Sequence, residues 1–255
     1  MMGVNHAISG AAAWTALAVT APGFPALGYT PMEPWQVITG AVICAGAALL
    51  PDADHHSATI AYAVPGGGVV TGVAGALTGG HRHGMHSILA VVGIWFATGW
   101  LAGLSWQPAW WGSAIPIGAA LAIMFLVTIS LKVLKLAKSW PRAWMFGILG
   151  GAVLGLAMPD ALGWFQLAVT VGYAVHLLGD YLTVQGINWF WPLKIRAPKF
   201  ISNIPILKDM WGENGYFSLP LLGTAGSWRE AIVGWVMSLY VLAGFGASLL
   251  SPLLP

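Results

Sequence analysis

The residues of this sequence that could do chemistry are its seven histidines and the carboxylates beside them. They fall into four short clusters: His6; Asp52, Asp54, His55 and His56 in LPDADHHS; His81, His83 and His86 in HRHGMHS; and His176 with Asp180 in GYAVHLLGDYLT. Imidazole and carboxylate groups without cysteine are typical ligands of zinc, manganese or iron in hydrolytic sites. The clusters therefore predict a metal site, provided that the fold brings them together.

The spacing inside the clusters supports this interpretation. His176 and Asp180 are four residues apart, so on a helix both side chains project from one face and can hold one cation. His81 and His86 flank Gly84, in a loop that can curl two imidazoles inward. Without His56 and His83, the clusters contain eight candidate ligands: His6, Asp52, Asp54, His55, His81, His86, His176 and Asp180. One tetrahedral ion needs four, so the number of candidates indicates two or three divalent ions, with zinc as the first choice.

Each cluster taken alone has a simpler explanation. His6 could be a surface residue, and Asp52, which follows a proline, could cap a helix without binding metal. We expect His56 and His83 to point away from the site as bystanders. Arg82 is the one cation inside the clusters, and it could hold a substrate phosphate or, equally, anchor the chain at the lipid headgroups.

The elements that must position these residues are predicted to be membrane helices. Of the 255 residues, 58% are hydrophobic and 7% are charged, whereas soluble domains carry about 25% charged residues. This composition excludes a cytosolic globule, a disordered chain and a nucleic-acid binder with a basic face. Residues 83–131 contain no Asp, Glu, Lys or Arg, and such a run is long enough for two crossings of about 20 residues. The single cysteine, Cys44, excludes an internal disulfide.

The apolar runs predict an all-α, polytopic helical bundle with about seven spans. We place these spans near 7–22, 36–50, 87–104, 113–131, 143–158, 163–181 and 231–249. Residues 57–79 are broken by Pro65 and several glycines, so we expect a re-entrant or interfacial segment there. The whole chain, 1–255, is interpreted as one membrane-embedded domain with a cytoplasmic or interfacial segment at 183–229.

The charges predict how this bundle is oriented. Threading the spans in alternation puts all ten basic residues on one side, which the positive-inside rule makes cytoplasmic. The same threading puts the N-terminus inside and the C-terminus outside. It also places the four His/Asp clusters at span ends on the cytoplasmic face, provided that 57–79 is not a full crossing.

These motifs resemble a known family. The N-terminal His, LPDADH, HRHGMHS and HLLGDYLT followed by GINWFWPL look like the YdjM-type, inner-membrane-associated metal-dependent hydrolases, which are similar in motif logic to zinc-dependent phospholipases C and single-strand nucleases. The resemblance covers the motif regions from residue 6 to about 193. Met85 stands where the family usually has Thr, which removes a hydroxyl near the ligands. The metal ligands that the resemblance implies are His6, Asp52, Asp54, His55, His81, His86, His176 and Asp180, with Thr183 and Gly186 shaping the turn that follows.

The expected function is that of an integral-membrane hydrolase of the inner (plasma) membrane. A metal-activated water would attack a phosphoester at the cytoplasmic interface, with membrane lipids or a small phosphoester as substrate and no nucleic acid as partner. Asp52 or Asp54 could be the general base rather than a ligand, because a carboxylate beside such a water can take its proton.

Two other functions stay open. A metal-ion or proton transporter would use the His and Asp residues as a relay, although the middles of the third, fourth, fifth and seventh predicted spans contain no ionisable residue. A structural membrane subunit with a vestigial site would bind no metal.

Overall fold

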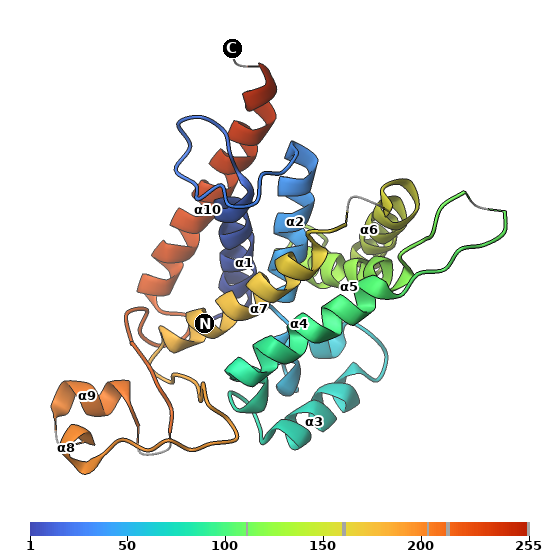
Figure 1. Cartoon of the computed structure of the whole chain (residues 1–255). Coiled ribbons are helices and arrows are strands. Elements are labelled where there is room, and N and C mark those ends of the chain that lie inside the picture. Colours follow the sequence, from blue (N-terminus) through green and yellow to red (C-terminus); the bar gives the residue numbers. More distant parts are fainter. Residues whose placement is uncertain (111, 160–161, 203, 213–214, 254–255) are drawn as a thin grey trace.

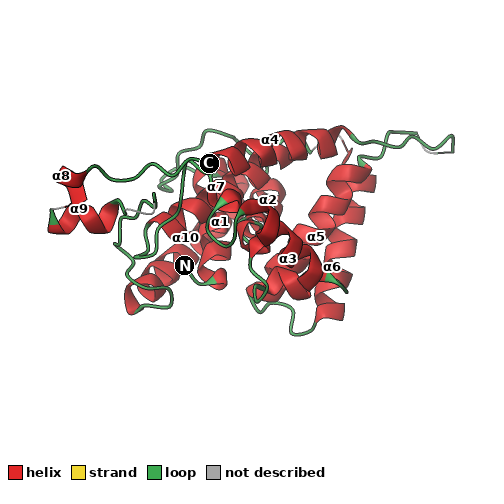
Figure 2. Ribbon diagram, turned by 90° about the horizontal axis from the view of Figure 1, so that it is seen from below, coloured by secondary structure: helices red, strands yellow, loops and turns green. Residues whose placement is uncertain are grey.

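The fold is all-α, as the sequence predicts. A computed structural model describes residues 1–110, 112–159, 162–202, 204–212 and 215–253, and within these ranges it contains helices, turns and isolated β-bridges but no β-strand (Figures 1 and 2). The α-helices are α1 Gly3–Ala18, α2 Pro34–Ala47, α3 Gly67–Thr78, α4 Ile88–Gly103, α5 Ile117–Val133, α6 Trp140–Ala152, α7 Phe165–Tyr181, α8 Lys199–Ser202, α9 Pro205–Met210 and α10 Trp228–Leu250. Short 3-10 helices at Pro51–Asp54 (η1), Thr59–Tyr62 (η2) and Gly84–His86 (η3) connect several of them.

Each of the seven predicted spans coincides with a helix, but seven full crossings are not confirmed. Within the described residues, two helical segments are both long and apolar enough to cross a bilayer, Pro34–Asp54 and Trp228–Leu250. The other helices at predicted spans are shorter; α4 has 16 residues and α5 has 17. A straight crossing of a hydrocarbon layer of about 30 Å needs about 20 residues. The other helices are shorter than this, so the prediction of seven full crossings is not confirmed.

Residues 57–79 contain one short α-helix. The helix α3 has 12 residues, which corresponds to a length of about 18 Å. Gly66 and Gly79 bound it with φ of 77° and 84°, in the left-handed region that glycine adopts without steric cost. This length agrees with our expectation that the segment does not cross the membrane.

Glycines bring the helices α1, α2 and α7 into close contact. A Cβ atom added at Gly10 of α1 or at Gly172 of α7 would collide with the main-chain carbonyl of Cys44 in α2. Because both positions lack a Cβ, α1 and α7 can approach α2 from two sides. The helix α1 packs against α2, α7 and α10, while α5 packs against α2 and α6 (Figure 1).

The direction of the helices gathers several of their ends on one side of the bundle. The helices α1 and α4 begin there, and α2 and α7 end there, so the four His/Asp clusters meet. The start of α10 lies close by, because Glu230 accepts hydrogen bonds from Asn5 and from the main chain of Met2. The loop after α4 and the segment with α8 and α9 project from opposite sides of this bundle (Figure 2).

Candidate metal centre

Members of all four His/Asp clusters lie together in the structure. At the centre, Nε2 of His86 and Nε2 of His176 face each other at 3.1 Å. Asp52 Oδ1 lies 3.9 Å and 3.7 Å from these two nitrogens. Asp180 Oδ2 lies 3.6 Å and 3.7 Å from them. Donor atoms bound to one zinc ion lie about 3.3–3.6 Å apart, so the distances from the two imidazole nitrogens to these carboxylate oxygens are close to those around a divalent cation.

The hydrogen bonds of the two imidazoles fix which nitrogen carries the proton. The Nδ1 atom of His176 lies 2.7 Å from the carbonyl oxygen of Ala48, which can only accept, so Nδ1 donates. The Nδ1 atom of His86 likewise donates to Asp54 Oδ2 at 3.2 Å. When both rings are neutral, their Nε2 atoms therefore point lone pairs at each other.

Two lone pairs at this distance repel unless a positive charge stands between them. Burial lowers the pKa of the His86 imidazole, while its bond to Asp54 acts in the opposite direction. A metal-ligating histidine usually donates its other ring N–H to a carbonyl or a carboxylate, as both rings do here. The donor set thus fits a divalent metal.

Two further histidines flank this centre. The ring of His6 stacks on His176 with centroids 3.6 Å apart. His6 Nε2 lies 3.2 Å from Asp180 Oδ1, and His6 Nδ1 is buried without a hydrogen-bond partner among the described residues. Two groups of three residues each offer ligand atoms within 4.8 Å of one another: His6, His176 and Asp180; and Asp52, His81 and His86. The two groups meet where His86 faces His176, and the predicted number of ions stays a prediction.

Asp54 stands behind the histidines. Its Oδ1 accepts from His81 Nδ1 at 2.8 Å, and its Oδ2 accepts from His86 Nδ1 and from the main-chain N–H of Arg82, both at 3.2 Å. Both of its oxygens therefore face N–H groups and not imidazole lone pairs. This geometry is that of a carboxylate that orients metal-binding histidines, whereas the sequence predicted Asp54 as a ligand or a base.

Arg82 is turned into the protein. Its side chain is 8% exposed, and its Nη2 donates to Asp180 Oδ1 at 3.1 Å. Its Nη1 donates to Thr183 Oγ1 at 3.2 Å and to the carbonyl oxygen of Gly186 at 3.3 Å. These bonds engage Nη1 and Nη2 and tie the turn after α7 to the centre, while Nε is buried without a hydrogen-bond partner among the described residues.

His55 and His56 lie on the outer side of η1. The ring centroid of His55 is 4.7 Å from that of His81, but its Nδ1 is hydrogen-bonded to Ser57 Oγ at 2.9 Å. His55 is half-buried and His56 is exposed. His56 therefore lies where a bystander is expected, and the predicted ligand role of His55 stays a prediction.

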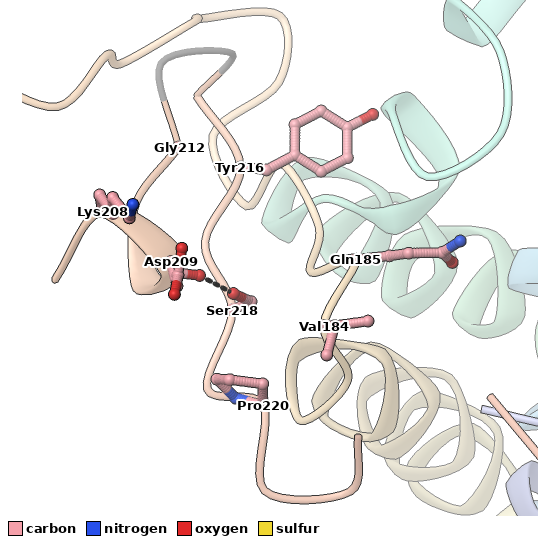
Figure 3. A pocket seen from close by; sticks show the side chains of 8 residues that line it. All are labelled: Val184, Gln185, Lys208, Asp209, Gly212, Tyr216, Ser218 and Pro220. Carbon is pink, nitrogen blue, oxygen red and sulfur yellow. Dashed lines mark hydrogen bonds between the residues drawn. The ribbon is translucent and has the colours of Figure 1, made fainter. Parts of the chain in front are cut away.

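His83 connects the centre to the segment that contains α9. The hydroxyl of Tyr216 lies 3.1 Å and 3.2 Å from its two ring nitrogens, and His83 Nδ1 is 3.0 Å from the carbonyl oxygen of His81. Beside Tyr216 is a pocket of about 390 Å³ lined in part by Gln185 and Lys208 (Figure 3). Its described walls include none of the eight candidate ligands, so this pocket lies outside the His/Asp cluster.

Sequence reasoning missed several residues that hold the centre in place. Tyr173 donates its hydroxyl to the carbonyl oxygen of Met85 at 2.6 Å and so fixes the main chain beside His86. Tyr173 lies three residues before His176 on α7, and this helical spacing is a signal that could have identified it. The contact between His176 and the carbonyl oxygen of Ala48 could not be predicted, because any residue type has this main-chain group.

Solvent reaches the centre beside Asp52. The side chains of Asp52 and His81 are 22% and 34% exposed, whereas those of His6, His86, His176 and Asp180 are at most 2% exposed. A pocket of about 170 Å³ opens at Asp52, with Gly3, Ser57, Thr59 and Val133 among its walls. A small polar molecule can therefore approach the centre from this side.

The comparisons with known proteins agree with this description. No curated protein and no solved structure matches the chain. The sequence pattern of the family described as YdjM inner membrane protein matches residues 1–127 and again residues 119–250, which together span almost the whole chain. The chain therefore belongs to the YdjM inner membrane protein family.

Proposed function

We propose that this membrane protein is a metal-dependent hydrolase of phosphoesters whose centre lies at the cytoplasmic interface. The observation that carries the proposal is the pair of apposed Nε2 atoms of His86 and His176, 3.1 Å apart, with Asp52 and Asp180 beside them. Such a set of two imidazoles and two carboxylates in a largely buried place is costly to maintain unless it binds a cation.

His86, His176 and Asp180 are the residues that would hold one divalent ion, with Asp52 beside it, and His6 and His81 extend the set toward a second. When bound, zinc or a similar ion supplies an acidified water and stabilises the charge that develops on the phosphoryl oxygens. The ligands are all nitrogen and oxygen atoms, which suits a hydrolytic metal site.

Asp52 is our choice for the general base. It lines the pocket through which water reaches the centre, and its side chain is partly exposed. Asp54 does not suit this role, because N–H groups occupy both of its oxygens. In the reaction, the water oxygen forms a bond to phosphorus and the bond from phosphorus to the leaving alcohol breaks. The proton taken from water by Asp52 returns to that alcohol.

Arg82 acts in this scheme as a positioning residue. Its guanidinium holds Oδ1 of Asp180 at 3.1 Å, so that Oδ2 is the carboxylate oxygen turned toward the imidazoles of His86 and His176. A lysine at this position could not make the same three bonds at once, because its ammonium lacks the planar fork of arginine.

The test is hydrolysis by detergent-purified, zinc-loaded protein of a phosphomonoester, a phosphodiester and a phospholipid. We expect cleavage of at least one of them, lost with a chelator and restored by metal. The variant Asp180→Ala should lose it, while the matched surface variant His56→Ala keeps it. Protein with full metal occupancy that cleaves none of the three contradicts the proposal. Metal-dependent uptake into proteoliposomes that Asp180→Ala abolishes would instead support transport.

A further inference from the structure

An apolar groove lies near the polar pocket at Asp52. The groove has a volume of about 330 Å³ and lies between α1, α2, α10 and the chain after α5, with walls that include Val4, Ile8, Val42, Ala45, Leu134 and Phe245. On each of three elements, a residue of the polar pocket is adjacent to a residue of the groove. These pairs are Gly3 with Val4, Leu49 with Ala45 one turn away, and Val133 with Leu134. The two spaces share no described lining residue, and these three pairs place them close together along the chain.

The groove lies against the two helical segments of the described chain that could cross a bilayer, Pro34–Asp54 and Trp228–Leu250. Its floor includes Ala11 and Ala45, whose small side chains leave space between the helices. Leu242 at its rim is 66% exposed. The groove is therefore open to lipid along its side.

The groove extends along α1, away from the polar pocket at Asp52. Along α1 its walls run from Val4, next to the polar pocket, to Ala11, and seven residues of helix correspond to about 10 Å. A molecule that occupies both spaces would place a polar group at Asp52 and an apolar chain between α1, α2 and α10. A phosphorylated lipid has this form.

We propose that the substrate is a lipid phosphoester that places its phosphate-bearing head at Asp52 and seats one hydrocarbon chain in this groove. The inference rests on the proposed hydrolase function for the reaction, but the seating of the chain can be tested without it. Val42 is the residue to change, because it is half-buried in α2 and lines the groove. A tryptophan there fills the groove without replacing a fully buried side chain.

The first experiment compares two esters with the same headgroup, one with short chains and one with long chains. In V42W we expect the ratio of kcat/KM for the long-chain ester to that for the short-chain ester to fall about tenfold, which is the loss of contact with two buried methylenes. The matched control V236W changes an exposed residue of α10 outside the groove and should keep the ratio. If the ratio in V42W is unchanged and both esters are still cleaved, the proposal that a substrate chain occupies the groove is wrong. The proposed hydrolase function is not affected by that result.

The second experiment needs no activity. A phosphatidic acid with a diazirine at its chain end is incorporated in nanodiscs with the full chain, and the cross-linked residues are mapped by mass spectrometry. We expect labels at Val241 and Phe245, reduced in V42W and kept in V236W. Labels spread evenly over the exposed face of α10, such as Val236 and Leu239, overturn the proposal. If Val241 and Phe245 are labelled in protein that cleaves no ester, the binding of a lipid chain in the groove is supported and the proposed hydrolase function is wrong.

Discussion

Replacing Asp54 by asparagine should weaken metal binding without abolishing it. The Asp54 carboxylate accepts three N–H bonds, from His81, His86 and the main chain of Arg82. Asparagine keeps one carbonyl oxygen but turns an NH2 group toward a second donor, so either the bond from His81 or the bond from His86 is lost. A buried bond left unmade costs about 1–3 kcal/mol. Loss of a partner behind a metal ligand typically lowers metal affinity about 10–100-fold, which is about 1.4–2.7 kcal/mol.

The assay is competition for zinc between the purified variant and a chromogenic chelator, with unfolding followed separately. The matched control is Asp209→Asn, which removes an exposed carboxylate in α9 and should leave zinc affinity unchanged. A loss in Asp54→Asn as large as that in Asp180→Ala would refute the reasoning, because Asp54 would then be a ligand. An unchanged zinc affinity would refute it as well, because Asp54 would then have no role in orienting these histidines.

Three further predictions follow from the same contacts. His176→Ala and Asp180→Ala should each lower metal content and hydrolysis together, since both side chains face the centre, and metal kept in full by either variant would exclude that residue as a ligand. His56→Ala should change neither, because His56 is exposed; an equal loss would show that the neighbouring histidines have been assigned wrongly. Tyr173→Phe should lower the free energy of unfolding by about 1–2 kcal/mol, since the carbonyl of Met85 loses its bond, and an unchanged melting temperature would contradict this.

Much of the site could be predicted because ionisable residues are rare in this chain. The alternation of helices predicted that clusters far apart in sequence share one side, and His86 and His176 do meet there. The i, i+4 spacing predicted that His176 and Asp180 share a face, and their Nε2 and Oδ2 atoms are 3.7 Å apart. The scarcity of charged residues and the helical spacing can both be seen in the order of residue types along the chain, so these parts of the site could be predicted from the sequence.

What could not be predicted depends on the direction of individual bonds. Arg82 has a φ of 64°, and its side chain turns inward to Asp180, which no pattern of residue types encodes. Asp52 and Asp54 are two residues apart on a 3-10 helix with about three residues per turn, so they point to different partners. The number of full crossings was also beyond reach, because apolar runs predict where helices lie better than how long they are.

The most direct test of a metal centre between His86 and His176 is elemental analysis of the detergent-purified chain after zinc loading and extensive dialysis. We predict at least one zinc ion per chain in the unaltered protein and a clear loss in Asp180→Ala. A chain that retains no divalent metal above the level of the buffer would contradict the account, because the two lone pairs that face each other at 3.1 Å would then require a different explanation.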